Sequence, residues 1–199
     1  MTLPAVNGAL IEAARDGSSP AWTALVRAWG PTVLRWCRYQ GGGSIDHEDA
    51  AHEVFIRLHE RIGRLHSPER FRAFLYGITR RVVSEHRRRA WWRRWTPGAV
   101  PDHAGGESPE RQLERAQVAR TIEVVLERVP ERFREVLIHC DVEGQSMAEA
   151  AELTGLPVNT VKTRLYRGRQ RFRKEAARLD LTLDRVVQTP EEEALHVQA

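Results

Sequence analysis

The chain has little cysteine: among its 199 residues only Cys37 and Cys140 occur, far apart in the sequence. Two cysteines cannot form the disulfide framework that stabilises small secreted domains. Because both have apolar neighbours, we expect them to be buried free thiols. No stretch approaches the roughly 18 apolar residues of a membrane-spanning helix, and residues 1–12 lack the basic start and apolar core of a signal peptide. We therefore expect a cytoplasmic protein that does not insert into membranes.

Patterns that would indicate catalysis or metal binding are also missing. The eight histidines are scattered, and none has metal-ligand spacing beside cysteines or carboxylates. The sequence contains no phosphate-binding glycine loop, dinucleotide fingerprint or nucleophile elbow. We therefore expect no enzyme activity, no cofactor and no bound metal.

Lysine is nearly absent, since Lys162 and Lys174 are the only two among 31 basic residues. A GC-rich genome would explain this arginine bias, so the distribution of the charge is more informative. The net charge of +4 divides into two basic blocks, residues 1–95 and 129–179, with an acidic spacer between them and an acidic tail after them. Two basic blocks suggest two contacts with a polyanion such as nucleic acid.

Strand patterns are almost absent, and apolar residues recur at helical spacing along most of the chain. Between Thr96 and Pro109 the composition changes to prolines and glycines that favour turns and linkers. We predict an all-α protein of two small helical domains, the second containing a helix-turn-helix. The predicted parts are an N-terminal domain (1–95), a flexible linker (96–112), a C-terminal domain (113–179) and an acidic tail (180–199).

The N-terminal domain is expected to contain four helices, over about residues 4–16, 20–40, 46–62 and 68–89. The third has Glu48 and Asp49 in its first turn, where the helix dipole favours acids. Its apolar stripe indicates a buried face: Ala51, Val54, Phe55, Leu58 and Ile62. The fourth follows Ser67 and Pro68, a predicted N-cap and a proline in the first turn.

The C-terminal domain contains the most specific pattern. Ser146 and Glu149 have the spacing of a capping box, which would begin a short alanine-rich helix, Met147–Leu153. Residues Thr154–Pro157 form a tight glycine-containing turn, and a longer helix begins at Val158. Two helices joined by such a turn are typical of the helix-turn-helix.

At about 100° per residue the longer helix has an apolar arc and a mainly basic arc. The apolar arc consists of Val158, Val161, Leu165, Gly168 and Phe172. The polar arc consists of Thr160, Arg164, Arg167 and Arg171. From Leu153 to Lys174 inclusive there are seven basic residues and no acidic residue, which favours DNA contact over an ordinary solvated surface.

A second basic cluster occupies the end of the N-terminal domain. It consists of Arg80, Arg81, Arg87, Arg88, Arg89, Arg93 and Arg94, with only Glu85 opposing it. The aromatic residues Phe71, Phe74 and Tyr76 precede it, and Trp91, Trp92 and Trp95 are interleaved with it. Arginines beside aromatic rings suit single-stranded or distorted nucleic acid, whose bases can stack on the rings. The alternative is that the phenylalanines are core residues and the tryptophans seal the domain edge.

Taken together, these motifs resemble those of the extracytoplasmic-function (ECF) sigma factors of bacterial RNA polymerase. Glu48–Leu58 resembles the helix that docks on the clamp of the polymerase β′ subunit. Phe71–Arg81, followed by Arg87–Arg89, resembles the helix that opens and reads the −10 promoter element. Val129–Leu137 and Leu156–Arg169 resemble the domain that reads the −35 element.

The resemblance implies three groups of contact residues. The −35 element would be read by Asn159, Thr160, Lys162, Thr163, Arg164, Arg167 and Arg171. The −10 element would be melted and read by Phe71, Phe74, Tyr76, Arg80, Arg81, Arg87 and Arg88, with unpaired bases held by the loop Arg61–Arg70. Core polymerase would be bound by Asp49, His52, Glu53 and Ile56, although these could equally form a plain solvated face.

The implied function is to bind core RNA polymerase and direct promoter-specific initiation at −35 and −10 elements. The implied partners are the polymerase β′ clamp and promoter DNA, together with an anti-sigma factor, which often holds members of the family inactive. The alternative is a stand-alone helix-turn-helix regulator that binds duplex DNA without polymerase. Against it, residues 20–95 show no evident ligand pocket or dimer seam.

Overall fold

The computed structural model describes residues 3–94 and 111–179, with side chains for 3–92 and 120–179. Its helices are α1 (Gly8–Arg15), α2 (Ser19–Gly41), α3 (His47–Arg61), α4 (Phe71–Arg94), α5 (Arg111–Arg128), α6 (Glu131–Leu137), α7 (Met147–Thr154) and α8 (Val158–Arg178). Shorter helical turns are η1 (Gly42–Ser44), η2 (Ile62–Arg64), η3 (Pro68–Arg70) and η4 (Ile138–Val142). Every regular element in these ranges is helical, which confirms the all-α class.

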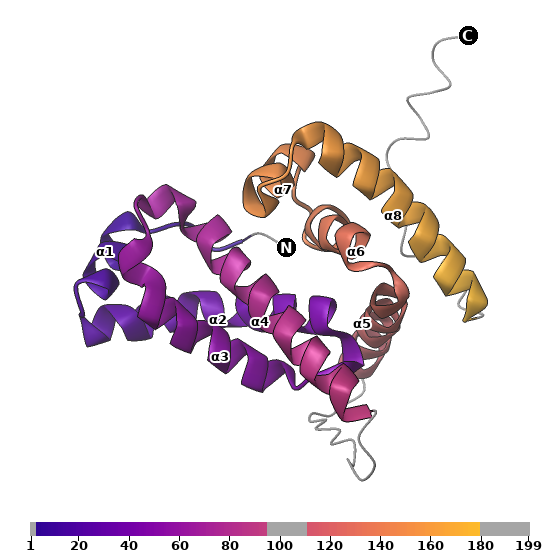
Figure 1. Cartoon of the computed structure of the whole chain (residues 1–199), viewed down its shortest axis with the longest axis horizontal. Coiled ribbons are helices and arrows are strands. Elements are labelled where there is room, and N and C mark those ends of the chain that lie inside the picture. The colour runs from indigo at the N-terminus through magenta and orange to yellow at the C-terminus, as the bar shows by residue number, and fades with distance from the viewer. Residues whose placement is uncertain (1–2, 95–110, 180–199) are drawn as a thin grey trace.

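The helices form two groups that lie side by side, α1 to α4 and α5 to α8 (Figure 1). This agrees with the prediction of two helical domains. The predicted linker falls almost entirely on residues 95–110, and the acidic tail on 180–199, both outside the described residues. The sequence boundaries of the domains therefore stay a prediction.

The core of the N-terminal domain lies between α2, α3 and α4. Trp29 of α2 packs edge-on against Phe71 of α4, with ring centroids 5.3 Å apart. Burying each such side chain contributes roughly 1.5–3 kcal/mol. Val54 and Leu58 of the predicted α3 stripe are completely buried, so the periodicity identified the inner face of this helix.

The start of α3 forms as its sequence predicts, but the start of α4 does not. The Asp46 carboxylate accepts hydrogen bonds from the backbone of Glu48 and Asp49, both at 2.9 Å. The Ser67 hydroxyl instead donates to the Glu69 carboxylate and caps no backbone N–H. Residues 68–70 form the separate turn η3, and α4 begins at Phe71.

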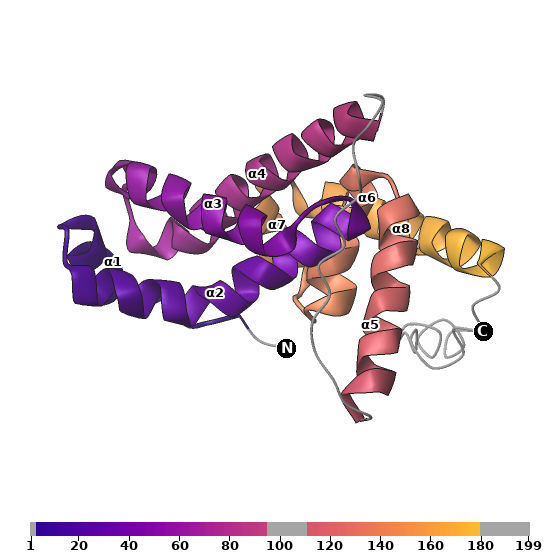
Figure 2. The ribbon, with the colours of Figure 1, turned by 90° about the horizontal axis from the view of Figure 1, so that it is seen from below.

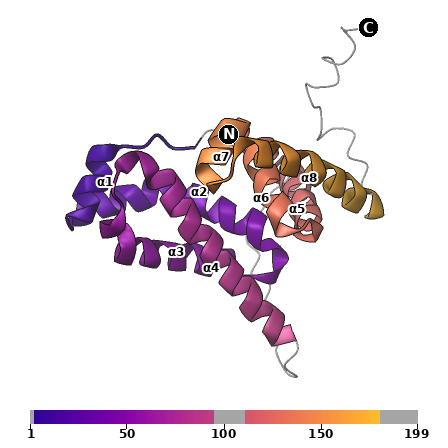
Figure 3. The same cartoon turned by 45° about the horizontal axis from the view of Figure 1, so that its top comes forward.

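Helix α4 also continues to Arg94, beyond the predicted end near Arg89, and its C-terminal end projects past its neighbours (Figure 3). The sequence holds no proline or glycine between Arg89 and Pro97, and arginines near a helix C-terminus are favoured by the dipole. These two causes explain the additional helical turn.

The C-terminal domain forms the predicted helix-turn-helix from α7 and α8. Ser146 and Glu149 make both hydrogen bonds of the capping box. Gly155 ends α7 with φ of 71°, a left-handed conformation that favours glycine. Gly168 allows α8 to approach α6, since a Cβ there would lie 3.0 Å from Leu137 Cγ.

Helix α8 lies on the side of the C-terminal domain away from the N-terminal domain, with α6 and α7 between them (Figures 1 and 2). The domains meet through contacts of α2 with α5 and α6, and of α4 with α7. No helix within the described residues is both long enough and apolar enough to span a membrane.

Candidate nucleic-acid interface

Helix α8 has a buried apolar side and an exposed polar side, as its sequence predicts. Val161, Leu165 and Phe172 are buried against the rest of the domain. Val158 differs from the prediction, because it stands in the first turn and is 48% exposed. Of the predicted DNA contacts, these side chains are exposed: Asn159, Lys162, Thr163, Arg167 and Arg171. Two others, Thr160 and Arg164, are half-buried at the edge of the packed side.

Two residues on the exposed side of α8 were missed by the sequence analysis. Tyr166 is 66% exposed, and Gln170 is also exposed. With Asn159 and Thr163 they follow a spacing of four, three and four residues, so they form one stripe along the helix. The sequence analysis grouped the residues of this helix as apolar or basic, so it did not recognise these four as a set. Their i, i+4, i+7 spacing is visible in the sequence and could have identified them.

Basic residues frame this stripe on both sides. Lys162, Arg169 and Arg173 lie on one side at helical spacing, and Arg167, Arg171 and Lys174 lie on the other. Arg169 is held by Asp141, with N–O distances of 2.8 and 3.1 Å. A hydrogen-bonding and aromatic stripe between two rows of cations matches duplex DNA, which presents base edges between two phosphate backbones.

The candidate −10 residues on α4 divide into buried and exposed positions. Phe71 is completely buried against Trp29, so we assign it to the core and leave it out of the candidate DNA contacts. Phe74 is half-buried. The arginines Arg80, Arg81 and Arg88 are exposed, and Arg87 is half-buried. The arginines of α4 are therefore accessible to DNA, whereas Phe71, the first of the three predicted aromatic contacts, stabilises the fold.

Tyr76 is 1% exposed because the C-terminal domain covers it. Its hydroxyl donates to Glu135 Oε1 at 3.2 Å and accepts from Gln40 Nε2 at 3.0 Å. Burial, followed by the negative charge of Glu135, raises the pKa of Tyr76 well above its ordinary value. In this arrangement Tyr76 cannot contact a base.

The candidate polymerase-docking residues lie on α3. Asp49 and His52 are exposed, and Ile56 is an exposed apolar residue at 48%. Isolated exposed apolar residues are common, so the exposure of Ile56 does not by itself identify a protein contact. Glu53 is half-buried, since it pairs with Arg57 and lies 2.6 Å from His86 Nε2 of α4.

The charges around Glu53 set its protonation. Burial alone would raise the pKa of Glu53, but the hydrogen bond with His86 and the charges of Arg57 and Arg89 together lower it. Glu53 is therefore ionised at neutral pH and ties α3 to α4. These contacts lie within the N-terminal domain, so they assign Glu53 a role in holding the two helices together that does not depend on polymerase.

The loop predicted to hold unpaired bases connects α3 to α4. Within it, Gly63, Arg64, His66, Glu69 and Arg70 are exposed, whereas Leu65 is buried and anchors the loop. Among the described side chains there is no group of three or more histidine, cysteine or acidic residues that could hold a metal ion.

Comparison with known protein families gives two matches. The family model "Sigma-70 region 2" matches residues 25–93, which span most of α2 through α4. The model "Sigma-70, region 4" matches residues 119–172, from within α5 through most of α8. Together the two models cover more than half of the chain, and they place the two candidate DNA-binding helices in different regions.

Individual relatives agree with these matches. The chain is 32% identical over 177 residues to the probable RNA polymerase sigma-C factor of Mycobacterium bovis, covering 87% of this chain and 93% of that protein. It is 29% identical over 176 residues to the ECF RNA polymerase sigma factor SigE of Mycolicibacterium smegmatis, covering 85% of this chain and 67% of that protein.

Among solved structures, CnrH in complex with the cytosolic domain of CnrY has the same fold, with a TM-score of 0.64. That likeness covers 88% of this chain and 98% of the matched chain at 24% identity. The fold, the two family matches and the similarity over nearly the whole length of a sigma factor lead to one conclusion. This chain belongs to the ECF sigma factors of RNA polymerase.

Proposed function

We propose that this sigma factor divides promoter recognition between α8, which holds the −35 element as duplex, and α4, which captures the opened −10 element. Core polymerase would dock on α3. The strongest support comes from the exposed side of α8. There a stripe of hydrogen-bonding and aromatic side chains lies between two rows of cations, which suits the major groove.

For the −35 element, the proposed contacts are the seven residues predicted from the sequence together with Tyr166 and Gln170. Asn and Gln can each make two hydrogen bonds to adenine, and an apolar ring can contact a thymine methyl. The flanking arginines and lysines would hold phosphates and fix the register of the helix.

For the −10 element, the proposed contacts are Phe74, Arg80, Arg81, Arg87 and Arg88, with the loop Arg61–Arg70 beside them. Arginines that follow the strand backbone, next to an aromatic side chain, are typical of single-strand binding. Tyr76 joins this group only if the C-terminal domain moves away from it. In this proposal, binding of the unpaired strand to these residues drives melting of the −10 element.

For polymerase docking, the proposed surface is the exposed side of α3 formed by Asp49, His52 and Ile56, with Glu53 at its edge. We further propose that the protein acts in the cytoplasm, where bacterial DNA is transcribed, and that it catalyses no reaction of its own. CnrH is seen bound to a second protein, which supports proposing a regulatory partner here as well. A stand-alone regulator is not favoured, because both sigma regions match.

In vitro transcription of a genomic DNA library tests the proposal. Purified core polymerase is used with and without this protein, and RNA start sites are mapped. We expect start sites that appear only when both are present, preceded by two shared elements. Duplex binding by the protein alone, without any initiation in the presence of core polymerase, would contradict the proposal and favour a stand-alone regulator.

A further inference from the structure

Two tryptophans near the C-terminal end of α4 lie outside all of the proposed contact surfaces. Trp91 is 52% exposed and Trp92 is 62% exposed, and their rings meet edge to face with centroids 4.9 Å apart. The alternative that the tryptophans seal the edge of the domain is not supported for these two, since about half or more of each residue is exposed. Trp95 lies outside the described residues.

We propose that the tryptophan pair, Trp91 and Trp92, holds the double-stranded DNA between the −10 and −35 elements as a third promoter contact. The inference rests on the proposed role of α4 in capturing the −10 element. It concerns the segment of the promoter that the other proposed surfaces leave unassigned.

The tryptophan pair lies on the same side of α4 as the outward-facing −10 contacts. At about 100° per residue, Trp92 comes five whole turns after Phe74, and Arg81 and Arg88 fall within about 40° of the same line. Arg88 precedes Trp91 and Trp92 by three and four residues, so it lies next to both on the helix surface. Both of these arginines are exposed. One continuous surface therefore leads from Phe74 to the tryptophans.

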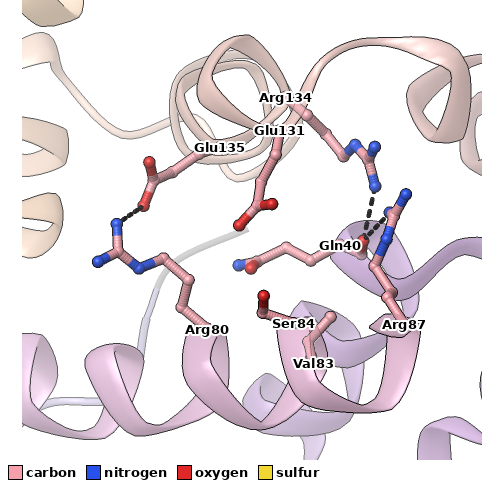
Figure 4. A pocket seen from close by; sticks show the side chains of 8 residues that line it. All are labelled: Gln40, Arg80, Val83, Ser84, Arg87, Glu131, Arg134 and Glu135. Atoms are coloured by element: carbon pink, nitrogen blue, oxygen red, sulfur yellow. Dashed lines mark hydrogen bonds and ion pairs between the residues drawn. The ribbon is translucent and has the colours of Figure 1, made fainter. Parts of the chain in front are cut away.

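The other two arginines of the −10 group face a different way. Arg80 Nη1 lies 3.4 Å from Glu135 Oε1 of α6, and Arg87 donates to the Gln40 carbonyl at 2.8 Å. Figure 4 shows both side chains turned toward the C-terminal domain, around a cavity of about 10 Å³ lined by residues of α2, α4 and α6. The row that ends at the tryptophans is a separate side of α4, so DNA can follow it without displacing these contacts.

The charge around the tryptophan pair favours a polyanion over a protein surface. From His86 to Trp95 the sequence holds five arginines and no acidic residue. Arg89 is also exposed, although its Nη1 lies 3.7 Å from Glu53 Oε2 of α3. Guanidinium groups bind phosphate oxygens, and an indole combines an apolar ring with one N–H donor. This combination suits the edge of a DNA backbone, where apolar sugars alternate with phosphates.

The position of the pair along α4 indicates paired DNA. The loop Arg61–Arg70, proposed to hold unpaired bases, precedes the first turn of α4, whereas the tryptophans lie at the opposite end, which projects past its neighbours (Figure 3). Phe74 and Trp92 are separated by about 27 Å along the axis, or roughly eight base-pair steps of 3.4 Å. In the proposed arrangement α4 runs from the opened element toward the −35 duplex, and the tryptophans meet the paired DNA in between.

Two forked DNA probes made from a mapped promoter test the inference. Both carry an unpaired −10 strand and lack the −35 element. The long fork continues upstream into about ten base pairs of duplex, enough to reach the tryptophans, whereas the short fork ends at the upstream edge of the −10 element. The holoenzyme of core polymerase and the full-length protein should bind the long fork about tenfold more tightly, as measured by fluorescence anisotropy.

Removing both rings should remove most of this preference. The double variant Trp91→Ala, Trp92→Ala should bind the long fork at least about fivefold more weakly than the unmodified protein and the short fork equally well. The double variant Trp91→Phe, Trp92→Phe keeps a ring at each position and should retain most of the preference. As a control, Val124→Ala shortens an exposed apolar side chain on α5 and should change neither affinity. Circular dichroism checks folding, and Trp92→Ala alone serves if the double alanine variant does not fold.

Three results would overturn the inference. The first is an unmodified holoenzyme without preference for the long fork, and the second is a double alanine variant whose preference is unchanged. The third is equal weakening on both forks, or a loss of affinity for core polymerase without DNA, because the rings would then act on the unpaired strand or on a protein.

Failure of the proposed function would look different. If only the inference is wrong, the unmodified holoenzyme still binds the short fork. Binding of neither fork by the unmodified holoenzyme would contradict the proposed role of α4 itself, and the inference with it.

Discussion

Arginine side chains in this protein have two roles, and burial separates them. Arg134 is 3% exposed and donates to backbone carbonyls of both domains, so it holds structure together. Arg167 and Arg171 are exposed on α8, where a phosphate can reach them. The same residue type thus serves folding at one position and DNA binding at the other.

The phosphate role of Arg171 predicts a particular salt dependence. Arg171→Ala should weaken duplex binding similarly for all sequences and reduce the slope of log affinity against log salt by about 0.9. Arg128→Ala, an exposed arginine on α5, is the matched control and should leave the slope unchanged. Fluorescence anisotropy at several salt concentrations measures both. An unchanged slope in Arg171→Ala would show that this arginine touches no phosphate.

Truncating Phe71 should lower stability, whereas truncating Tyr166 should lower DNA affinity. Phe71→Ala removes a buried ring and should reduce the free energy of unfolding by about 3–5 kcal/mol. Tyr166→Ala removes an exposed ring, so stability should change by less than about 0.5 kcal/mol. It should instead weaken binding to the −35 duplex by about tenfold. Denaturant unfolding and anisotropy separate the two effects, and a stable Phe71→Ala protein would refute the core assignment.

Residue types alone predicted the positions of these side chains only in part. Periodicity correctly placed Val54, Leu58 and Val161 inside, because a buried face repeats along a helix. It could not place Phe71, since an aromatic residue near arginines suits either a core or a base. Three-dimensional packing against Trp29 decides between the two.

At the scale of helices, the pairing of α3 with α4 depends on charges as well as apolar contact. Arg57 of α3 pairs with Glu53 and lies 2.6 Å from Glu85 of α4. The hydrogen bond from Arg57 is the main reason that the pKa of Glu85 is lowered. Each carboxylate is therefore more easily ionised in the folded than in the unfolded protein.

This cluster predicts how stability changes with pH. Because the folded pKa lies below the ordinary glutamate value of 4.5, the stabilisation is present above that value and is lost as pH falls through the lowered one. Glu85→Gln should cost roughly 0.5–1 kcal/mol at neutral pH. The difference from the unmodified protein should shrink in acid. Denaturant unfolding along a pH series tests this, and a difference independent of pH would contradict it.

Helix starts were predictable from capping residues only in part. Ser146 caps its helix as expected, and Asp46 caps the helix that was expected to start near it, since the acceptor and the free backbone N–H groups lie within three residues. Ser67 makes no cap hydrogen bond: its hydroxyl donates to Glu69, and residues 68–70 form the separate turn η3 before α4 begins at Phe71.

At the scale of the whole molecule, the family and the two domains were predictable, but their contact was not. The pairs Arg35–Glu143 and Gln40–Arg134 join residues 108 and 94 positions apart. No local pattern specifies such partners, because the charges involved look like ordinary solvated residues in the sequence. This contact between the domains is what separates Tyr76 from the DNA that its helix is proposed to bind.

The division of labour between α8 and α4 is the central claim, and promoter opening tests it most directly. A fluorescent base analogue is placed in the −10 element of a mapped promoter, and opening is followed with core polymerase and the unmodified protein or the Arg80→Ala, Arg81→Ala double variant. We predict that the variant still protects the −35 duplex in a footprint but opens the −10 element at least about tenfold less. Normal opening by this variant, or loss of −35 protection together with opening, would contradict the account.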